Sequence, residues 1–170
     1  MDITELILRD HHEQRHLFAL LDDVDRSDSA SLATIWDQLA ILLEVHAAAE
    51  EEHFYPTLLG IGSGATDADD PEEETQDAIT DHNDIRDGVA AAGRHDVGGA
   101  EWWGAVARTR AANSDHMGEE ERQALADFRR HADLGTRHDL GVAFARYEAE
   151  HADGITATNE DADAYIADRT

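Results

Sequence analysis

The sequence predicts an all-α protein, an up-down-up-down four-helix bundle with an additional C-terminal helix. Three observations support this fold class. Apolar residues recur three and four positions apart along most of the chain, and no segment shows the alternation of a strand. Short turn signals separate four long helical stretches, and such helices pack antiparallel. Histidines replace apolar residues on one face of every stretch, at intervals of about 35 residues, so they meet at a similar level of the bundle.

The first helix is expected at residues 3–26. Its apolar stripe is interrupted in the middle, where His11 and Gln14 take positions that face the core. Residues 27–31 follow with the sequence Ser-Asp-Ser-Ala-Ser, which is rich in residues that cap helix N-termini. The first helix therefore combines an apolar face with a buried histidine and ends at a short turn.

The second helix is expected at residues 32–59. Its stripe is apolar at first and then changes to His46, Glu50 and His53. Residues four apart on a helix lie on the same face, so His46 and Glu50 are expected to point in the same direction. The glycine-rich turn at 60–64 suits the C-terminal end of this helix.

The third and fourth helices repeat this pattern. The third begins at Pro71, because an aspartate that can cap the helix precedes the proline, and it carries His82 on its apolar side. A turn at 93–99 ends it. The fourth helix is expected to run without interruption over 100–130, because no proline breaks it, and it carries His116 in its apolar stripe.

The chain is thus divided into a bundle and a C-terminal extension. Residues 1–130 are expected to form the bundle with its candidate site. Residues 131–154 contain a fifth helix, at about 137–151, that is expected to pack on the bundle. Residues 155–170 are acidic and are expected to form a loose tail, with a short helical turn near its end as an open alternative.

Composition narrows the choice of partners. The 170 residues carry a net charge of −26, from 39 acidic residues against 13 basic ones, all of them arginine. Such a chain repels phosphate backbones and anionic lipids, so no nucleic acid and no membrane is expected as a partner. Without cysteine, a metal site must use imidazole and carboxylate, which suit iron, manganese or zinc. No segment resembles a signal peptide or a long apolar span, so the expected location is cytoplasmic.

Six residues on the buried faces have the chemistry and spacing of metal ligands. Two histidines are each followed four positions later by a glutamate, so the imidazole can hold one metal while the carboxylate bridges to a second. One such pair alone is usually an ordinary ion pair, but burying four imidazoles and two carboxylates without a cation would be costly. The predicted ligands are His11, His46, Glu50, His82, His116 and Glu120.

A ferritin-like site is the main alternative within metal chemistry. Those bundles combine Glu-x-x-His motifs on two helices with single glutamates on two others. The chain has three such motifs, which begin at Glu13, Glu50 and Glu148. The motif at Glu13 lies off the main apolar face, and the third and fourth helices have none. This arrangement therefore leaves His82 and His116 unexplained.

The whole pattern resembles the hemerythrin-like, or HHE cation-binding, family. Four segments carry the resemblance, and they are Leu8-Arg-Asp-His-His-Glu13, His46-Ala-Ala-Ala-Glu-Glu-Glu-His-Phe-Tyr-Pro56, Asp81-His-Asn-Asp-Ile-Arg86 and His116-Met-Gly-Glu-Glu-Glu121. The resemblance implies a four-helix bundle around a non-haem centre of two iron ions, bridged by oxide or hydroxide. Carried over by position, its ligands are His11, His46, Glu50, His82, His116 and Glu120.

The chain departs from the family pattern on the third helix. Hemerythrins that carry oxygen present two histidines one turn apart there, whereas Arg86 occupies the second position here. This difference argues against simple reversible oxygen carriage. Tyr55 can reach the site as a ligand or hydrogen-bond donor, although packing at the bundle end is favoured. His53 shares the stripe of the second helix and is a further candidate for contact with the site.

The expected function is that of a di-iron protein that binds or reduces O2, peroxide or nitric oxide, with a catalase- or peroxidase-like reaction as a candidate activity. A non-catalytic sensor or iron-handling module is the alternative. A less favoured one is an oxygenase with an organic substrate held near Trp36 and the Trp102-Trp103 pair. Zinc or manganese remains open as the metal. The sequence specifies no protein partner and does not decide between a monomer and a homodimer.

Overall fold

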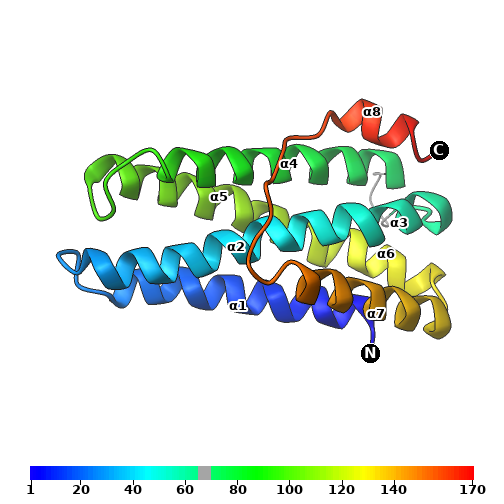
Figure 1. Cartoon of the computed structure of the whole chain (residues 1–170). Helices are drawn as coiled ribbons and strands as arrows, with labels where there is room; N and C mark the ends of the chain where they lie inside the picture. The colour runs from blue at the N-terminus through cyan, green and yellow to red at the C-terminus, as the bar shows by residue number, and fades with distance from the viewer. Residues whose placement is uncertain (65–69) are drawn as a thin grey trace.

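A computed structural model describes residues 1–64 and 70–170 and confirms the helical bundle. Four long helices run antiparallel, and they are α1 (Ile3–Asp23), α2 (Ser29–His53), α4 (Pro71–Ala92) and α5 (Ala100–Arg122). The α1–α2 and α4–α5 loops lie at one end of the bundle (Figure 1). The other end carries the short helices α3 (Tyr55–Ile61) and α6 (Ala124–His131). The described ranges contain helices and loops but no strand.

Aspartates fix the starts of three of the long helices. The side chains of Asp2, Asp28 and Asp70 each accept a backbone N–H of the first turn. Such caps stabilise a helix by about 0.5–2 kcal/mol each, and their negative charge also suits the positive end of the helix dipole. The cap at Asp28 explains why α2 begins at Ser29, three residues earlier than expected.

Two of the expected helices are interrupted near the same end of the bundle. The helix expected at 32–59 breaks at Phe54, just before Pro56, which has no N–H to donate and clashes with the preceding turn. The helix expected to be continuous over 100–130 breaks at Gln123, so that expectation was wrong. No proline or glycine marks this second break. The break turns Phe128 into the core, where its ring lies 4.9 Å from that of Phe54.

The core consists of two apolar clusters with a polar layer between them. One cluster surrounds Trp36 and Trp102, whose ring centroids are 5.8 Å apart. Both indoles are buried in the core, at 5 % and 1 % exposure. The other cluster, around Phe54, Phe128 and Phe144, fills the end formed by α3, α6 and α7. The predicted metal ligands occupy the layer between the two clusters, so each apolar cluster shields one side of that layer from water.

The C-terminal residues wrap around the bundle. Helix α7 (Leu134–Glu150) lies against α1 and α2, and the chain then crosses α2 to reach α4, where α8 (Ala162–Ala167) packs (Figure 1). The backbone of Glu160 exchanges two hydrogen bonds with the Asn83 side chain, at 2.7 and 3.0 Å. Tyr165 is buried, and its hydroxyl donates to the backbone carbonyl of Glu51. The short helical turn that was left open for the end of 155–170 is therefore present as α8, and the anchor at Tyr165 replaces the loose tail that was expected.

One stretch, Ser29–Ile61, is long and apolar enough to cross a membrane by length and composition alone. Core helices of soluble proteins pass the same test. Here the stretch comprises α2 and α3, and it carries the buried charged residues Glu50 and Glu51 in the middle of the bundle. Buried ionisable residues that face a helical core favour a soluble bundle over a lipid-facing span.

Candidate metal centre

The four long helices bring all six predicted residues into the polar layer. Each helix places its ligand-type residue between apolar ones: on α1, for example, His11 follows Ile7 and precedes Leu17, which belong to different clusters. The six side chains belong to residues that are at most 4 % exposed, and they are His11, His46, Glu50, His82, His116 and Glu120.

Five of these residues form two groups that share one carboxylate. The first group is His11, His46 and Glu50, and the second is Glu50, His82 and His116, with the ligand atoms of each group within 4.8 Å of one another. Glu50 Oε1 lies 3.0 Å from His46 Nε2, and Glu50 Oε2 lies 3.3 Å from His82 Nε2. The two oxygens of Glu50 therefore face different groups, which is the geometry of a carboxylate that bridges two cations.

Glu120 adjoins the first group without being a member of either. Its Oε2 lies 3.2 Å from His11 Nε2, and its Oε1 accepts a 2.7 Å hydrogen bond from the Tyr55 hydroxyl. Tyr55 is fully buried. The break at Phe54 places it there, because Tyr55 begins the short helix α3. Its hydroxyl thus reaches the site as a hydrogen-bond donor, whereas the sequence favoured packing at the bundle end.

A carboxylate lies against the outer nitrogen of each histidine. The Nδ1 atoms of His11, His46, His82 and His116 lie 3.0, 3.3, 2.8 and 3.6 Å from Glu121, Asp10, Glu51 and Asp81. An imidazole that donates Nδ1–H outward keeps its Nε2 lone pair for a metal, and such contacts also fix the ring orientation. Sequence reasoning missed these four residues, which we call the outer carboxylates.

The outer carboxylates form a closed ring around the bundle. Each outer carboxylate directly precedes or follows a predicted ligand in the sequence, yet its side chain contacts the histidine of a neighbouring helix. The carboxylate of α1 contacts the histidine of α2, that of α2 the histidine of α4, that of α4 the histidine of α5, and that of α5 the histidine of α1. Adjacent residues differ by about 100° around a helix. A residue next to an inward ligand therefore points toward a neighbouring helix. An acidic residue directly beside one predicted ligand on each of the four helices was the signal available in the sequence.

Charge in the centre is balanced by attraction between opposite groups. Burial disfavours the charged imidazole of His46, but the attraction of Glu50 and the contact with Asp10 hold its pKa well above the ordinary value. Burial alone would lower the pKa of His82 as well, yet hydrogen bonds to Glu50 and Glu51 raise it to about 9. Burial raises the pKa of Glu50, but His46 and His82 together hold it well below its usual range. A cation that binds here therefore displaces protons.

Unpartnered polar atoms show that these residues fit a metal. Among the described residues, His11 Nε2, His46 Nε2, Glu120 Oε2 and both carboxylate oxygens of Glu50 are buried and have no hydrogen-bond partner outside the centre; they face other predicted ligands at 3.0 to 3.3 Å. Leaving such atoms buried and unsatisfied is costly. These five atoms are nitrogen or oxygen donors of the kind that iron, manganese and zinc accept. The donor set therefore suits a divalent cation.

Arg86 and His53 do not contact the predicted ligand atoms. Arg86 is buried, but its guanidinium donates to Glu51 Oε2 at 2.7 Å, so Glu51 lies between the arginine and the imidazole of His82. Arg86 thus orients an outer carboxylate. His53 is only partly buried, and its ring packs on that of Tyr147, with centroids 5.8 Å apart.

A helical bundle with two groups of His and Glu donors between its apolar clusters defines a class of metal-binding proteins. A family model described as the hemerythrin HHE cation-binding domain matches residues 2–128, and the chain belongs to that family. The matched region contains all six predicted residues and the four outer carboxylates, and it ends in α6. Comparison with curated proteins and with solved structures gave no match.

Proposed function

We propose that this protein holds two iron ions and uses them to bind or reduce O2, peroxide or nitric oxide. The observation that carries the proposal is the pair of buried donor groups that share Glu50, whose two carboxylate oxygens face different groups. His11, His46 and Glu120 would hold the first iron, His82 and His116 would hold the second, and Glu50 would be shared between them.

The number of donors supports binding of a small ligand. Six protein ligands do not fill the coordination sites of two six-coordinate ions, so positions stay open for water or a small molecule. Iron bound there supplies Lewis acidity and electrons. The chain contributes a dry site that holds the ligand positions, and the Tyr55 hydroxyl carries a proton directly at Glu120. Because the six ligand residues are at most 4 % exposed, the site favours a diatomic molecule or peroxide over a larger organic substrate.

Reactivity of the iron-loaded protein tests this proposal. We expect its absorption spectrum to change on addition of O2, hydrogen peroxide or nitric oxide, and we expect peroxide to be consumed if the activity is catalase- or peroxidase-like. The Glu50→Gln variant serves as the control, because it removes the shared carboxylate. A loaded protein that consumes no peroxide and shows no spectral change with any of the three ligands contradicts a redox role.

The second candidate function is a non-catalytic sensor or iron-handling module. It is favoured by the C-terminal helices, because α7 is linked to the outer carboxylate Asp10 through Arg9, and α8 contacts the outer carboxylate Glu51 directly. Arg9 bridges Asp10 and Glu148 of α7 at 2.8 and 3.0 Å, and Tyr165 of α8 binds the Glu51 backbone. Metal binding at His46 or His82 then alters the packing of the extension. Limited proteolysis and thermal melting with and without iron test this, and identical behaviour excludes it.

The remaining expectations belong to the same proposal. We expect the protein to work in the cytoplasm. We also expect neither nucleic acid nor a membrane as a partner, because the net charge of −26 repels the phosphate groups of both. Whether the protein acts as a monomer or a homodimer is decided by its mass in solution.

A further inference from the structure

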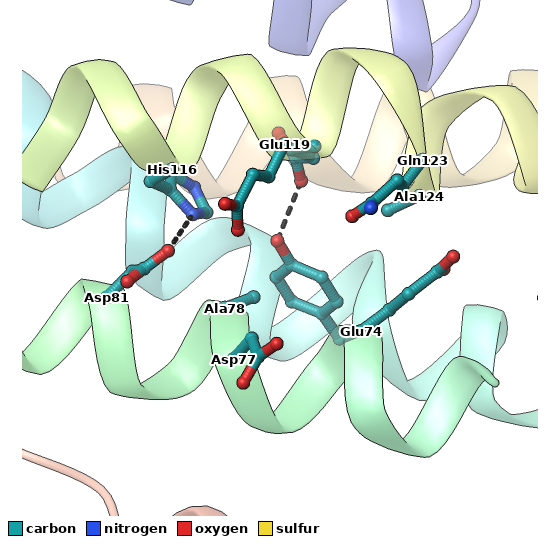
Figure 2. Close-up of a pocket in the computed structure, with 10 residues that line it drawn as sticks. Glu74, Asp77, Ala78, Asp81, His116, Glu119, Gln123 and Ala124 are labelled. Atoms are coloured by element: carbon teal, nitrogen blue, oxygen red, sulfur yellow. Dashed lines mark hydrogen bonds and ion pairs between the residues drawn. The ribbon is translucent and has the colours of Figure 1, made fainter. Parts of the chain in front are cut away.

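A narrow opening between α4 and α5 leads to the candidate metal centre. Its volume is about 20 Å³, and it is lined by Tyr55, Glu74, Asp77, Ala78, Asp81, His116, Glu119, Glu120, Gln123 and Ala124. Figure 2 shows Glu119 extending from α5 toward Asp77 and Asp81 on α4, with His116 beside them. A space of this size has room for about one water molecule, so it suits the passage of a single ion.

The lining is acidic along its whole depth. Asp77 and Glu119 are exposed at the mouth, Asp81 is half-buried behind them, and Glu74 and Glu120 are buried. None of the ten lining residues is an arginine. Carboxylates of one sign in a cleft with low-dielectric walls concentrate the field and attract counter-ions.

Two of the predicted metal ligands, Glu120 and His116, line the opening. The Glu120 side chain is only 2 % exposed, and its Oε2 has no hydrogen-bond partner. His116 lines the same opening, and its Nε2 lies 3.1 Å from His82 Nε2 in the second donor group. A cation that enters between Asp77 and Glu119 therefore meets one carboxylate after another until it reaches the centre.

We propose that this opening is the route by which divalent cations enter the centre, with Asp77 and Glu119 capturing the hydrated ion at the mouth. The inference rests on the proposed function of the centre as a metal site, but it does not require that the metal be iron. A hydrated ion is wider than the opening, so carboxylate oxygens of the lining replace its water molecules as it moves inward. The same charges slow anions that approach from this side.

The rate of cobalt uptake tests the route without any enzymatic readout. Co²⁺ is added to metal-free protein, and the absorption of the bound ion is followed by stopped flow. In the Asp77→Asn/Glu119→Gln variant we expect uptake to be about tenfold slower, in the range that electrostatic steering gives, with an unchanged amount of cobalt bound at the end. Raising the ionic strength slows uptake by the unmodified protein more than uptake by the variant.

The matched control is the Asp84→Asn/Glu101→Gln variant. It removes the same charge from exposed positions of α4 and α5 that do not line the opening. Uptake by the control at the rate of the unmodified protein supports the route. The route is wrong if both variants are equally slow, or if the mouth variant loads at the normal rate. An unmodified protein that binds no cobalt, manganese or iron contradicts the proposed function itself, whereas normal binding with an unchanged rate contradicts only the route.

Discussion

At the scale of single residues, Glu50 has the widest consequences. It is fully buried, and its two oxygens face different donor groups. We predict that Glu50→Gln lowers the metal content from about two ions per chain toward zero, because the amide removes the shared negative charge from both positions. Metal analysis of the purified variant measures this. Glu52→Gln is the control, since Glu52 is exposed on the same helix; a Glu50→Gln protein that keeps both ions contradicts the bridging role.

The raised pKa values of His46 and His82 predict a pH dependence of metal binding. Ligation requires a neutral Nε2, but the metal-free protein holds the proton on His82 up to about pH 9. Apparent affinity is therefore expected to rise with pH up to about 9, by about tenfold per pH unit for each proton displaced. Zinc titrations at pH 7 and pH 8 measure it, and an affinity that does not change between them rules out proton displacement.

The raised pKa of His82 also predicts that the stability of the metal-free fold falls as the pH rises, whereas the metal affinity increases. The folded pKa of His82 lies above its unfolded value of 6.5. The stabilisation is therefore fully present below pH 6.5 and is lost as the pH rises through about 9. Urea unfolding of the metal-free protein is expected to need less denaturant at pH 9 than at pH 6.5. An unchanged or higher midpoint at pH 9 contradicts the assignment.

Sequence reasoning found the inward residues of the centre because they interrupt apolar stripes. His11, His46, His82 and His116 each stand where a core residue is expected, and the structure buries all four. Sequence reasoning missed the outer carboxylates because acidic residues cover the surface of this chain. An aspartate that supports a ligand, such as Asp10, therefore cannot be distinguished by residue type from one exposed to solvent. Their position next to a ligand distinguishes them, but it predicts which histidine they contact only when the order of the helices around the bundle is known.

At the scale of elements, the caps and the period of the apolar residues predicted the four long helices, but the breaks followed from packing. Pro56 gave a signal for the first break. Nothing local marked the break at Gln123, which is driven by burial of Leu125 and Phe128 against α3. The docking of α8 likewise depends on one residue, Tyr165, in an otherwise polar segment. Tertiary contacts of this kind have no periodic signature.

Helix α7 lies outside the region that matches the family, and Phe144 is its main anchor. The residue is fully buried, and its ring lies 5.9 Å from that of His46. We predict that Phe144→Ala lowers the free energy of unfolding by about 3–5 kcal/mol, the usual cost of removing a buried phenylalanine. Val142→Ala, at a half-exposed position of the same helix, serves as the control for urea unfolding. A loss below about 1 kcal/mol for Phe144→Ala contradicts the packing of α7 on the bundle.

At the scale of the whole molecule, the polar layer between the two apolar clusters couples folding to metal binding. Without a cation, the centre leaves buried donor atoms unsatisfied, and a ligand that binds only the folded state stabilises it by mass action. We predict that saturating metal raises the melting temperature and slows proteolysis of the full chain. Differential scanning calorimetry with and without metal measures this effect, and coincident melting curves contradict the coupling.

The most direct measurement of the binuclear centre is the metal content of the chain, by plasma mass spectrometry, on protein purified without chelator or affinity metal. We predict close to two irons per chain, because two buried groups of His and Glu donors share Glu50. One metal per chain, or none after exposure to excess iron under anaerobic conditions, contradicts a two-iron centre.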